Sequence, residues 1–257
     1  MPKRAVLRPV SEQQAAAGGV ASVDRALSLL EVFTTDHPVL SLSELADRTR
    51  QYKSTVLRLL ASLEHSHVVR RHADGRFSLG ATVARLHAVY TSSFSLGEAV
   101  VPFLHDLVLR THESAAFHVR QGDKELCLQR VDSPHTVRDH TRAGDLQPLN
   151  GSVAGQVLRA YSGAAGARYE QIRRDQCLVA DGDIVPELAG ISAPVFGANG
   201  ELLGALVLTM PSTRMQAAHT DDVRQAAQRM TQRLGGTYPV AGAGRAGRGT
   251  RIRANPR

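Results

Sequence analysis

Side chains that can bind a polyanion gather at the start of the segment from Tyr52 to Glu64. Amino, hydroxyl and guanidinium groups there can donate hydrogen bonds to phosphate oxygens and base edges. They belong to Lys53, Ser54, Thr55 and Arg58. Behind them, apolar residues recur with the spacing of one helix face, at Val56, Leu59, Leu60 and Leu63. The pattern predicts a helix whose polar face enters the DNA major groove; an ordinary surface helix is the alternative.

A second, shorter amphipathic segment precedes this helix, from Leu42 to Arg48, with Ser41 or Ser43 as its cap. Only residues 49–51 separate the two segments. Two short helices joined so tightly form a helix-turn-helix. The residues around the turn that we also expect to contact DNA are Ser43, Gln51 and Tyr52.

A β-hairpin is predicted to follow the two helices. Two short strand-like runs between Val68 and Leu79 flank Asp74-Gly75, a dipeptide that strongly favours a tight hairpin turn. Arg71 and Arg76 lie near its tip, where we expect them to meet phosphates or the minor groove. A purely structural β-turn is the alternative for the hairpin alone. Helix, tight turn, helix and basic hairpin in this order predict a winged helix-turn-helix.

The composition favours a polyanionic partner and argues against a membrane protein. The 257 residues carry a formal net charge of +7 and a pI of about 10.0, and 42% of them are hydrophobic. No apolar run approaches the roughly 20 residues of a membrane helix, and the N-terminus lacks the apolar region of a secretion signal. Cys127 and Cys177 match no disulfide framework or zinc spacing. We therefore expect a cytoplasmic protein with no membrane partner.

The rest of the chain combines helical and strand-like patterns. A first helix is expected at 22–35, with Val23, Ala26, Leu27, Leu30 and Phe33 inward, and further helices at 80–96, 97–110 and 221–234. Strands are expected at 115–120, 125–131, 136–141, 190–196 and 202–209. Asn150 is a good cap for a helix rich in small residues, whose free N–H groups favour an anion. Close helix–sheet packing explains the same small residues equally well.

Common catalytic motifs are missing from the sequence, which has no Gly-x-Ser-x-Gly, Walker loop, dinucleotide fingerprint or His-Glu-x-x-His. Two histidine pairs, His135 with His140 and His112 with His118, lack a cysteine or acidic partner at ligand spacing, so we expect no metal and no cofactor. Two classes of function remain: a DNA-binding regulator gated by a small molecule, and a small-molecule-binding or catalytic module with only non-specific DNA affinity. The helix-turn-helix and hairpin favour the regulator, which is not an enzyme.

Three stretches, Ser22–Phe33, Leu42–Ala46 and Lys53–Leu60, resemble the N-terminal domain of the IclR family of bacterial transcriptional regulators, and the resemblance continues to about Pro211. It implies an α+β protein in which a linker helix joins a winged helix-turn-helix to a GAF-like α/β domain. The implied divisions are a flexible arm at 1–20, the DNA-binding domain at 21–80, the linker helix at 81–95, an effector-binding and oligomerisation domain at 96–239, and a disordered basic tail at 240–257.

In the second half, the resemblance implies an effector pocket. Pro148 to Leu158 looks like the family's Pro-Leu-His-Ala-Ser-Ala-Ala-Gly-Lys-Ala signature, with Asn150 for the histidine and Gln156 for the lysine. The implied pocket residues are Asn150, Gly151, Ser152, Asp181, Gly190, Val207 and Thr209. Relatives that bind small carboxylates have an acid, a thiol or a hydroxyl at several of these positions. Here Gly190 and Val207 carry no such polar group. We therefore expect a roomier, more apolar pocket for a hydrophobic or aromatic effector; a pocket that binds nothing is the alternative.

The resemblance also implies an assembly on double-stranded DNA. One helix reads too few bases to be specific, so we expect a homodimer, or a dimer of dimers (a homotetramer), on a palindromic operator, acting as repressor or activator. In the helix-turn-helix, Arg50 replaces a glycine of the family. This predicts either a reshaped turn or a left-handed backbone that costs about 1 kcal/mol.

Overall fold

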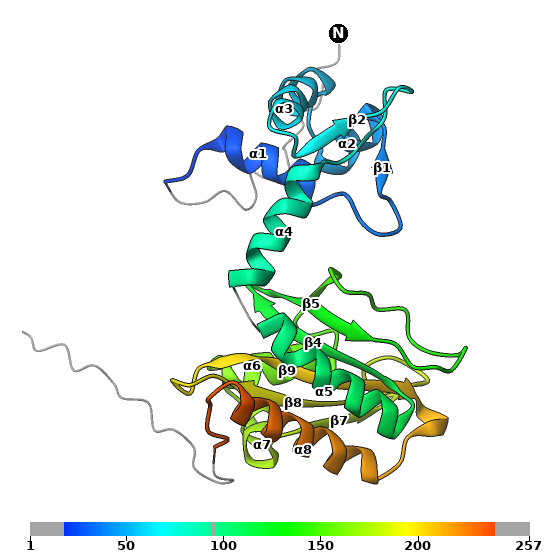
Figure 1. Ribbon diagram of the computed structural model, residues 1–257, viewed down its shortest axis with the longest axis vertical. Helices are drawn as coiled ribbons and strands as arrows, with labels where there is room; N and C mark the ends of the chain where they lie inside the picture. Colours follow the sequence, from blue (N-terminus) through cyan, green and yellow to red (C-terminus); the bar gives the residue numbers. More distant parts are fainter. Residues whose placement is uncertain (1–17, 94–95, 240–257) are drawn as a thin grey trace, which may run out of the picture. The chain divides into compact units, whose positions relative to one another are not determined.

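The computed structural model describes residues 18–93 and 96–239, which form two compact units that divide at residues 94 and 95. Figure 1 labels the elements of each unit. Most of the predicted N-terminal arm and the whole basic tail lie outside the described residues. The N-terminal unit has one hydrophobic core, and the C-terminal unit has one on each face of its sheet.

The N-terminal unit packs helices against a small antiparallel sheet. Its elements are α1 (Ala21–Leu30), β1 (Val39–Leu40), α2 (Leu42–Thr49), α3 (Lys53–His65), β2 (Val69–Arg71), β3 (Phe77–Leu79) and α4 (Ala81–Ser93). The strand order is β1-β3-β2, so β1 adds a third strand to the predicted hairpin. Buried residues from α1, α2, α3 and the three strands form one core. The prediction of a winged helix-turn-helix is confirmed.

Local sequence explains where α2 begins. The Ser41 hydroxyl accepts a hydrogen bond from the Glu44 backbone N–H, at 3.3 Å. In return, the Ser41 N–H donates to the Glu44 carboxylate at 2.7 Å, which completes a capping box. The Ser41 hydroxyl foremost, and then the Ser41 backbone N–H, lower the pKa of Glu44.

The predicted inward face of α1 is wrong in part. Val23 and Leu27 are about half exposed, whereas Leu29 is buried together with Ser28. Apolar residues occur around most of this helix, so their spacing alone does not select the inward face. The helix ends at Leu30, before Phe33, but Leu30 and Phe33 both pack, partly buried, against the core as predicted.

Arg50 follows α2 in the left-handed conformation, with φ 53° and ψ 39°. Its backbone N–H donates to the carbonyls of Ala46 and Asp47. The turn therefore keeps the geometry that a glycine would adopt without strain, and this chain tolerates the strain.

The C-terminal unit is built on a six-stranded antiparallel sheet of order β6-β5-β4-β9-β8-β7. Its elements are α5 (Leu96–Thr111), β4 (Ser114–Gln121), β5 (Lys124–Val131), β6 (Leu146–Pro148), α6 (Val153–Tyr161), α7 (Ala167–Asp175), β7 (Leu178–Asp181), β8 (Leu188–Phe196), β9 (Leu202–Pro211), the short 3₁₀ helix η2 (Ser212–Arg214) and α8 (Ala218–Arg233). The strand expected at 136–141 does not form; that segment is irregular, and β6 takes the sheet edge. The predicted α+β class is confirmed.

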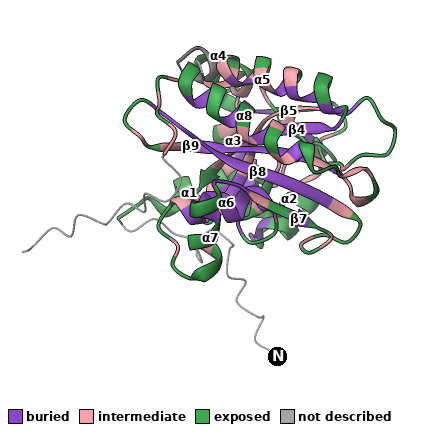
Figure 2. Cartoon of the chain, turned by 90° about the horizontal axis from the view of Figure 1, so that it is seen from below, coloured by how far each residue is buried: buried purple, intermediate pink, exposed green. Residues whose placement is uncertain are grey.

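The two faces of this sheet differ in chemistry. α5 and α8 cover one face, which presents fully buried apolar side chains such as Phe117, Ile191 and Leu208. α6 lies against the other face, and α7 packs on α6. Figure 2 shows the central strands β8 and β9 buried beneath helices whose outer surfaces are exposed. The polar side chains described below lie on the α6 face.

We expect that replacing Arg50 with glycine will raise the free energy of unfolding of the N-terminal unit by about 0.5–1 kcal/mol. Glycine adopts a positive φ without the clash that a Cβ atom causes. Urea denaturation of both proteins measures the difference.

Arg48→Gly is the matched control, because it also removes an exposed arginine but lies in the last helical turn of α2. Glycine costs about 1 kcal/mol there. Equal destabilisation by the two variants would show that the turn at Arg50 is unstrained.

Candidate DNA interface and effector pocket

α3 presents its polar residues on the outside of the N-terminal unit. Val56 and Leu60 are buried beneath it, which fixes the rotation of the helix. Lys53, Ser54 and Arg58 are exposed as a result, and Thr55 is partly exposed. Lys53, Ser54 and Thr55 occupy the first turn, where unpaired backbone N–H groups and the helix dipole also attract an anion.

The hairpin adds two arginines to this unit. The Arg71 guanidinium lies over the Phe77 ring, 5.7 Å from its centroid. Arg76 Nε donates to the Asp74 carboxylate at 2.7 Å, and the Arg76 backbone N–H binds the same carboxylate at 3.0 Å. These two bonds, the backbone one foremost, lower the pKa of Asp74. Because the pair is exposed, a phosphate can compete with Asp74 for Arg76 at little cost.

Gln51 does not face solvent, so the expectation that it contacts DNA is wrong. Its side chain is buried, and Nε2 donates to the Arg25 carbonyl at 3.2 Å and to the Ser28 hydroxyl at 3.1 Å. Both acceptors belong to α1, so Gln51 ties the turn to that helix. Ser43 and Tyr52, the other residues predicted around the turn, are exposed.

The predicted pocket residues separate in the structure. Gly190, Val207 and Thr209 lie on neighbouring strands, with Gly190 directly opposite Thr209. Asp181 is exposed on the outermost strand β7, where its neighbour Ala180 faces α6 instead. Alternate residues of a strand point to opposite faces, so including Asp181 in the pocket was wrong.

The start of α6 also differs from the expectation. Ser152 caps the helix, because its hydroxyl accepts a hydrogen bond from the Gly155 N–H at 2.9 Å. Asn150 and Gly151 lie in the exposed turn before it, so Asn150 is not the cap. A Cβ atom built on Gly190 would lie 2.9 Å from a methyl group of Val153. Val153 of α6 therefore occupies the space beside Gly190.

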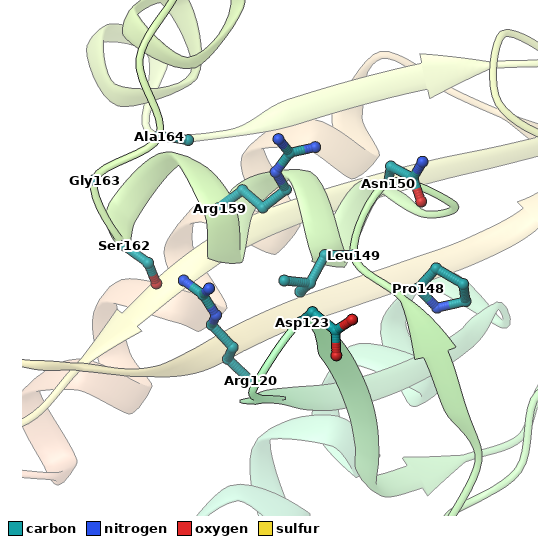
Figure 3. Close-up of a pocket in the computed structure, with 9 residues that line it drawn as sticks. All are labelled: Arg120, Asp123, Pro148, Leu149, Asn150, Arg159, Ser162, Gly163 and Ala164. Carbon is teal, nitrogen blue, oxygen red and sulfur yellow. The ribbon is translucent and has the colours of Figure 1, made fainter. Parts of the chain in front are cut away.

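An open cavity of about 560 Å³ lies along α6 (Figure 3). Among the predicted pocket residues, only Asn150 lines it. Arg120 and Arg159 both extend into this region, as Figure 3 shows. The complete lining is Arg120, Asp123, Pro148, Leu149, Asn150, Arg159, Ser162, Gly163 and Ala164.

A group of buried polar side chains lies on the α6 face, and no local pattern in the sequence predicts it. His118 Nδ1 lies 4.0 Å from the Glu125 carboxylate, and both side chains are almost fully buried. Nearby, the Arg130 guanidinium pairs with the Asp139 carboxylate. The Thr209 hydroxyl donates to that carboxylate at 3.1 Å, and the Ser152 hydroxyl neighbours Glu125, so two predicted pocket residues join this cluster.

A β-bulge explains why the alternation of side chains along a strand does not predict this cluster. The pairing of β4 with β5 shifts between Phe117 and His118, so that Cys127 lies opposite His118 while Arg130 lies opposite Ala116. Strict alternation would have placed Cys127 and Arg130 on opposite faces of the sheet. The shift puts both on the face toward α6.

Burial sets the protonation of these groups. It raises the pKa of Glu125 to about 7, although the neighbouring Ser152 hydroxyl opposes the shift. Burial, helped by the positive charge of Arg130, lowers the pKa of His118 to about 4. His118 is therefore neutral at pH 7, and Glu125 titrates near neutral pH instead of near its ordinary value of 4.5. Burial likewise raises the pKa of the free thiol of Cys127 to about 12, which leaves it unreactive.

Within the described ranges, no group of three histidine, cysteine, aspartate or glutamate side chains is placed to hold a metal ion. In the same part of the chain, no helix is both long and apolar enough to cross a bilayer.

A winged helix-turn-helix with a separate antiparallel-sheet domain is typical of DNA-binding transcription factors, and comparison with known proteins agrees. The model of the IclR helix-turn-helix domain matches residues 22–73, and that of the bacterial transcriptional regulator IclR C-terminal domain matches residues 88–169. Together they take in just over half of the chain. The chain belongs to the IclR family of transcriptional regulators.

Curated relatives have related names. The HTH-type transcriptional regulator BhcR of Paracoccus denitrificans is 25% identical over 244 residues, which cover 83% of this chain and 87% of BhcR. The HTH-type transcriptional regulator KipR of Bacillus subtilis is 28% identical over 140 residues. That match spans only 56% of KipR and 54% of this chain.

Solved structures share the fold. An IclR transcriptional regulator from Alicyclobacillus acidocaldarius superposes with a TM-score of 0.73 at 19% identity, covering 84% of this chain and 98% of that one. An IclR homologue from Microbacterium hydrocarbonoxydans, complexed with 4-hydroxybenzoate, superposes with a TM-score of 0.72 at 21% identity, covering 83% of this chain and 98% of that one.

We expect Glu125→Gln to stabilise the protein at pH 8 relative to wild type, and to do so much less at pH 5. Because folding raises the pKa of this carboxyl, the protein loses stability as the pH rises from about 4.5 to about 7. Glutamine does not ionise, so the variant avoids this loss, which is at most about 3 kcal/mol. Thermal unfolding at the two pH values measures it.

Glu170→Gln, which removes an exposed carboxyl from α7, is the control. A gain at pH 8 that is equal in both variants would contradict the burial argument.

Proposed function

We propose that this regulator binds a palindromic double-stranded operator through α3 and its hairpin, and that a small molecule bound on the α6 side of the second unit modulates the binding. The proposal rests chiefly on α3, whose buried Val56 and Leu60 force its basic and hydroxyl residues outward. The proposed DNA-contacting residues are Ser43, Tyr52, Lys53, Ser54, Thr55, Arg58, Arg71 and Arg76. Arginine and lysine beside hydroxyl groups suit both phosphates and base edges.

We propose that the protein acts as a homodimer, or as a dimer of dimers, because two half-sites one or two helical turns apart require two recognition helices. An exposed apolar stripe at the start of α1 supports this proposal. Val23 and Leu27 are 52% and 51% exposed and lie four positions apart on one face of the helix, and Val20, the extended residue just before it, is 62% exposed. Pairing such stripes between two copies would remove them from water.

A small-molecule effector is the third part of the proposal. The homologue complexed with 4-hydroxybenzoate shows that an aromatic acid occupies one protein of this fold. In this chain, Ser152, Gly190, Val207 and Thr209 surround the start of α6, and Asn150 lines the neighbouring cavity. The effector would act by binding the DNA-competent and incompetent states with different affinity.

We expect Arg58→Ala to weaken binding to a specific operator at least about tenfold, because a good arginine contact to a base edge contributes about 1–3 kcal/mol. Fluorescence anisotropy with labelled operator and with a scrambled duplex measures the effect.

Arg168→Ala is the matched control, since it removes an equal charge from an exposed position on α7 in the other unit. Similar losses in both variants, or an equal loss on the scrambled duplex, would show that α3 does not read sequence.

For the dimer, we expect Leu27→Glu to shift the protein toward monomers in sedimentation at micromolar concentration, because a charge would be buried in the apolar contact. Leu109→Glu is the control: Leu109 is 74% exposed, but the helix positions before it on the same side are His105 and Asp106. Unchanged association of Leu27→Glu would place the dimer contact elsewhere.

A further inference from the structure

We propose that Gln51 determines which spacing between operator half-sites the protein accepts, because its buried side chain fixes the start of α3 relative to α1. Gln51 is then a positioning residue, which acts on DNA recognition without facing the DNA. This inference rests on the proposed function, since it takes α3 as the recognition helix and α1 as the contact between two copies.

Gln51 holds the turn of the helix-turn-helix from two sides. Its backbone N–H donates to the Ala46 carbonyl of α2 at 3.0 Å. Its side-chain Nε2 donates to two acceptors of α1, the Arg25 carbonyl at 3.2 Å and the Ser28 hydroxyl at 3.1 Å. The next residue, Tyr52, is the N-cap of α3. Gln51 therefore bonds to α1 and α2, and only one residue separates it from the helix that we propose to read DNA.

α1 presents two different sides. Val23 and Leu27 are about half exposed and form the proposed contact with a second copy. Ser28 is buried on the inner side, where its hydroxyl also donates to the Arg25 carbonyl at 2.9 Å. Gln51 therefore bonds to the inner side of the helix whose outer side would meet the partner. In a symmetric pair of copies that meet through α1, the position of α3 relative to α1 fixes the separation of the two recognition helices.

The hydrogen bonds of the Gln51 side chain give direction and little stability. Gln51 is 4% exposed, yet its Oε1 has no hydrogen-bond partner among the described residues. A buried acceptor without a partner costs free energy, which offsets what the two bonds of Nε2 contribute. A hydrogen bond nevertheless requires its donor and acceptor to be aligned, whereas apolar contacts allow helices to slide. The amide thus restricts where α3 lies relative to α1.

Leucine at position 51 removes this restriction and leaves no further buried group unpaired. The Ser28 hydroxyl still donates to the Arg25 carbonyl, and the unpaired Oε1 is gone. An apolar side chain of similar volume also keeps the buried space filled. We therefore expect Gln51→Leu to fold and to unfold thermally within about 4 °C of wild type.

The test is fluorescence anisotropy with three labelled duplexes: the operator found by footprinting, the same operator with two base pairs inserted between its half-sites, and a single half-site. The insertion turns one half-site by about a fifth of a helical turn, so both copies can bind only if α3 shifts relative to α1. In wild type this shift breaks the bonds of Gln51. We expect Gln51→Leu to lower the preference for the native spacing about threefold to tenfold, the range that one or two hydrogen bonds contribute.

The single half-site separates positioning from simple support of α3. Gln51→Leu should bind it within about twofold of wild type, because the residues of α3 that we propose to contact DNA are unchanged. Equal losses on the operator and on the half-site would overturn the proposal, and so would an unchanged preference for the native spacing. Gln171→Leu is the control, since it removes the same amide from an exposed position on α7 in the other unit. It should leave all three affinities at the wild-type values.

Ser28→Ala tests the same contact from α1 and keeps the proposal testable if Gln51→Leu does not fold. It removes one of the two acceptors of Nε2, so the preference for the native spacing should fall about twofold. Combining the two changes should lower the preference no further than Gln51→Leu alone, because both break the same contact. A preference that Ser28→Ala leaves at the wild-type value, or effects that multiply in the double variant, would overturn the proposal.

The two levels of the account fail in different ways. If wild type prefers the native spacing and Gln51→Leu does so equally, the proposed function stands and the role of Gln51 fails. If wild type binds the expanded operator as tightly as the native one, the symmetric assembly on a palindrome fails, and the role of Gln51 fails with it.

Discussion

A buried positive charge must be paired with an anion, and this requirement determines which side chains lie on the α6 face of the C-terminal sheet. The face of the sheet toward α5 and α8 is apolar, so all buried ionisable groups of β4 and β5 gather toward α6. Arg130 carries the positive charge among them, and its hydrogen bonds hold Asp139 and the loop around it against the sheet. The same pairing brings Thr209 into contact with the loop. One ion pair thus joins β5, the loop and Thr209 of β9.

In the N-terminal unit, the burial of apolar side chains determines which residues are exposed. Val56 and Leu60 fix how α3 is rotated, and Gln51 fastens the turn to α1. The basic residues of α3 are exposed because the opposite side is committed to the core, and not because of any interaction of their own. Strain at Arg50 is tolerated within this arrangement, since the tight turn is what brings α2 and α3 together.

Short-range sequence signals predicted the DNA-binding unit well. The helical spacing of Val56 and Leu60, the Ser41 cap and the Asp74-Gly75 turn each act within a few residues, so they are visible in the chain. The sequence did not predict the orientation of α1, because that orientation depends on packing against distant elements. In the second unit, the bulge at Phe117 and His118 reversed the alternation expected in the sheet. The contact between Asp139 and Thr209 spans 70 residues, and no local pattern announces it.

The central claim is that this chain reads a specific DNA site as a symmetric assembly. A footprint of the wild-type protein on the DNA that flanks its own gene, at two salt concentrations, tests it most directly. The account predicts two protected half-sites, related by a two-fold axis and one or two helical turns apart, that persist at the higher salt. Diffuse protection that fades steeply with salt would contradict it, because the net positive charge alone would then explain the binding.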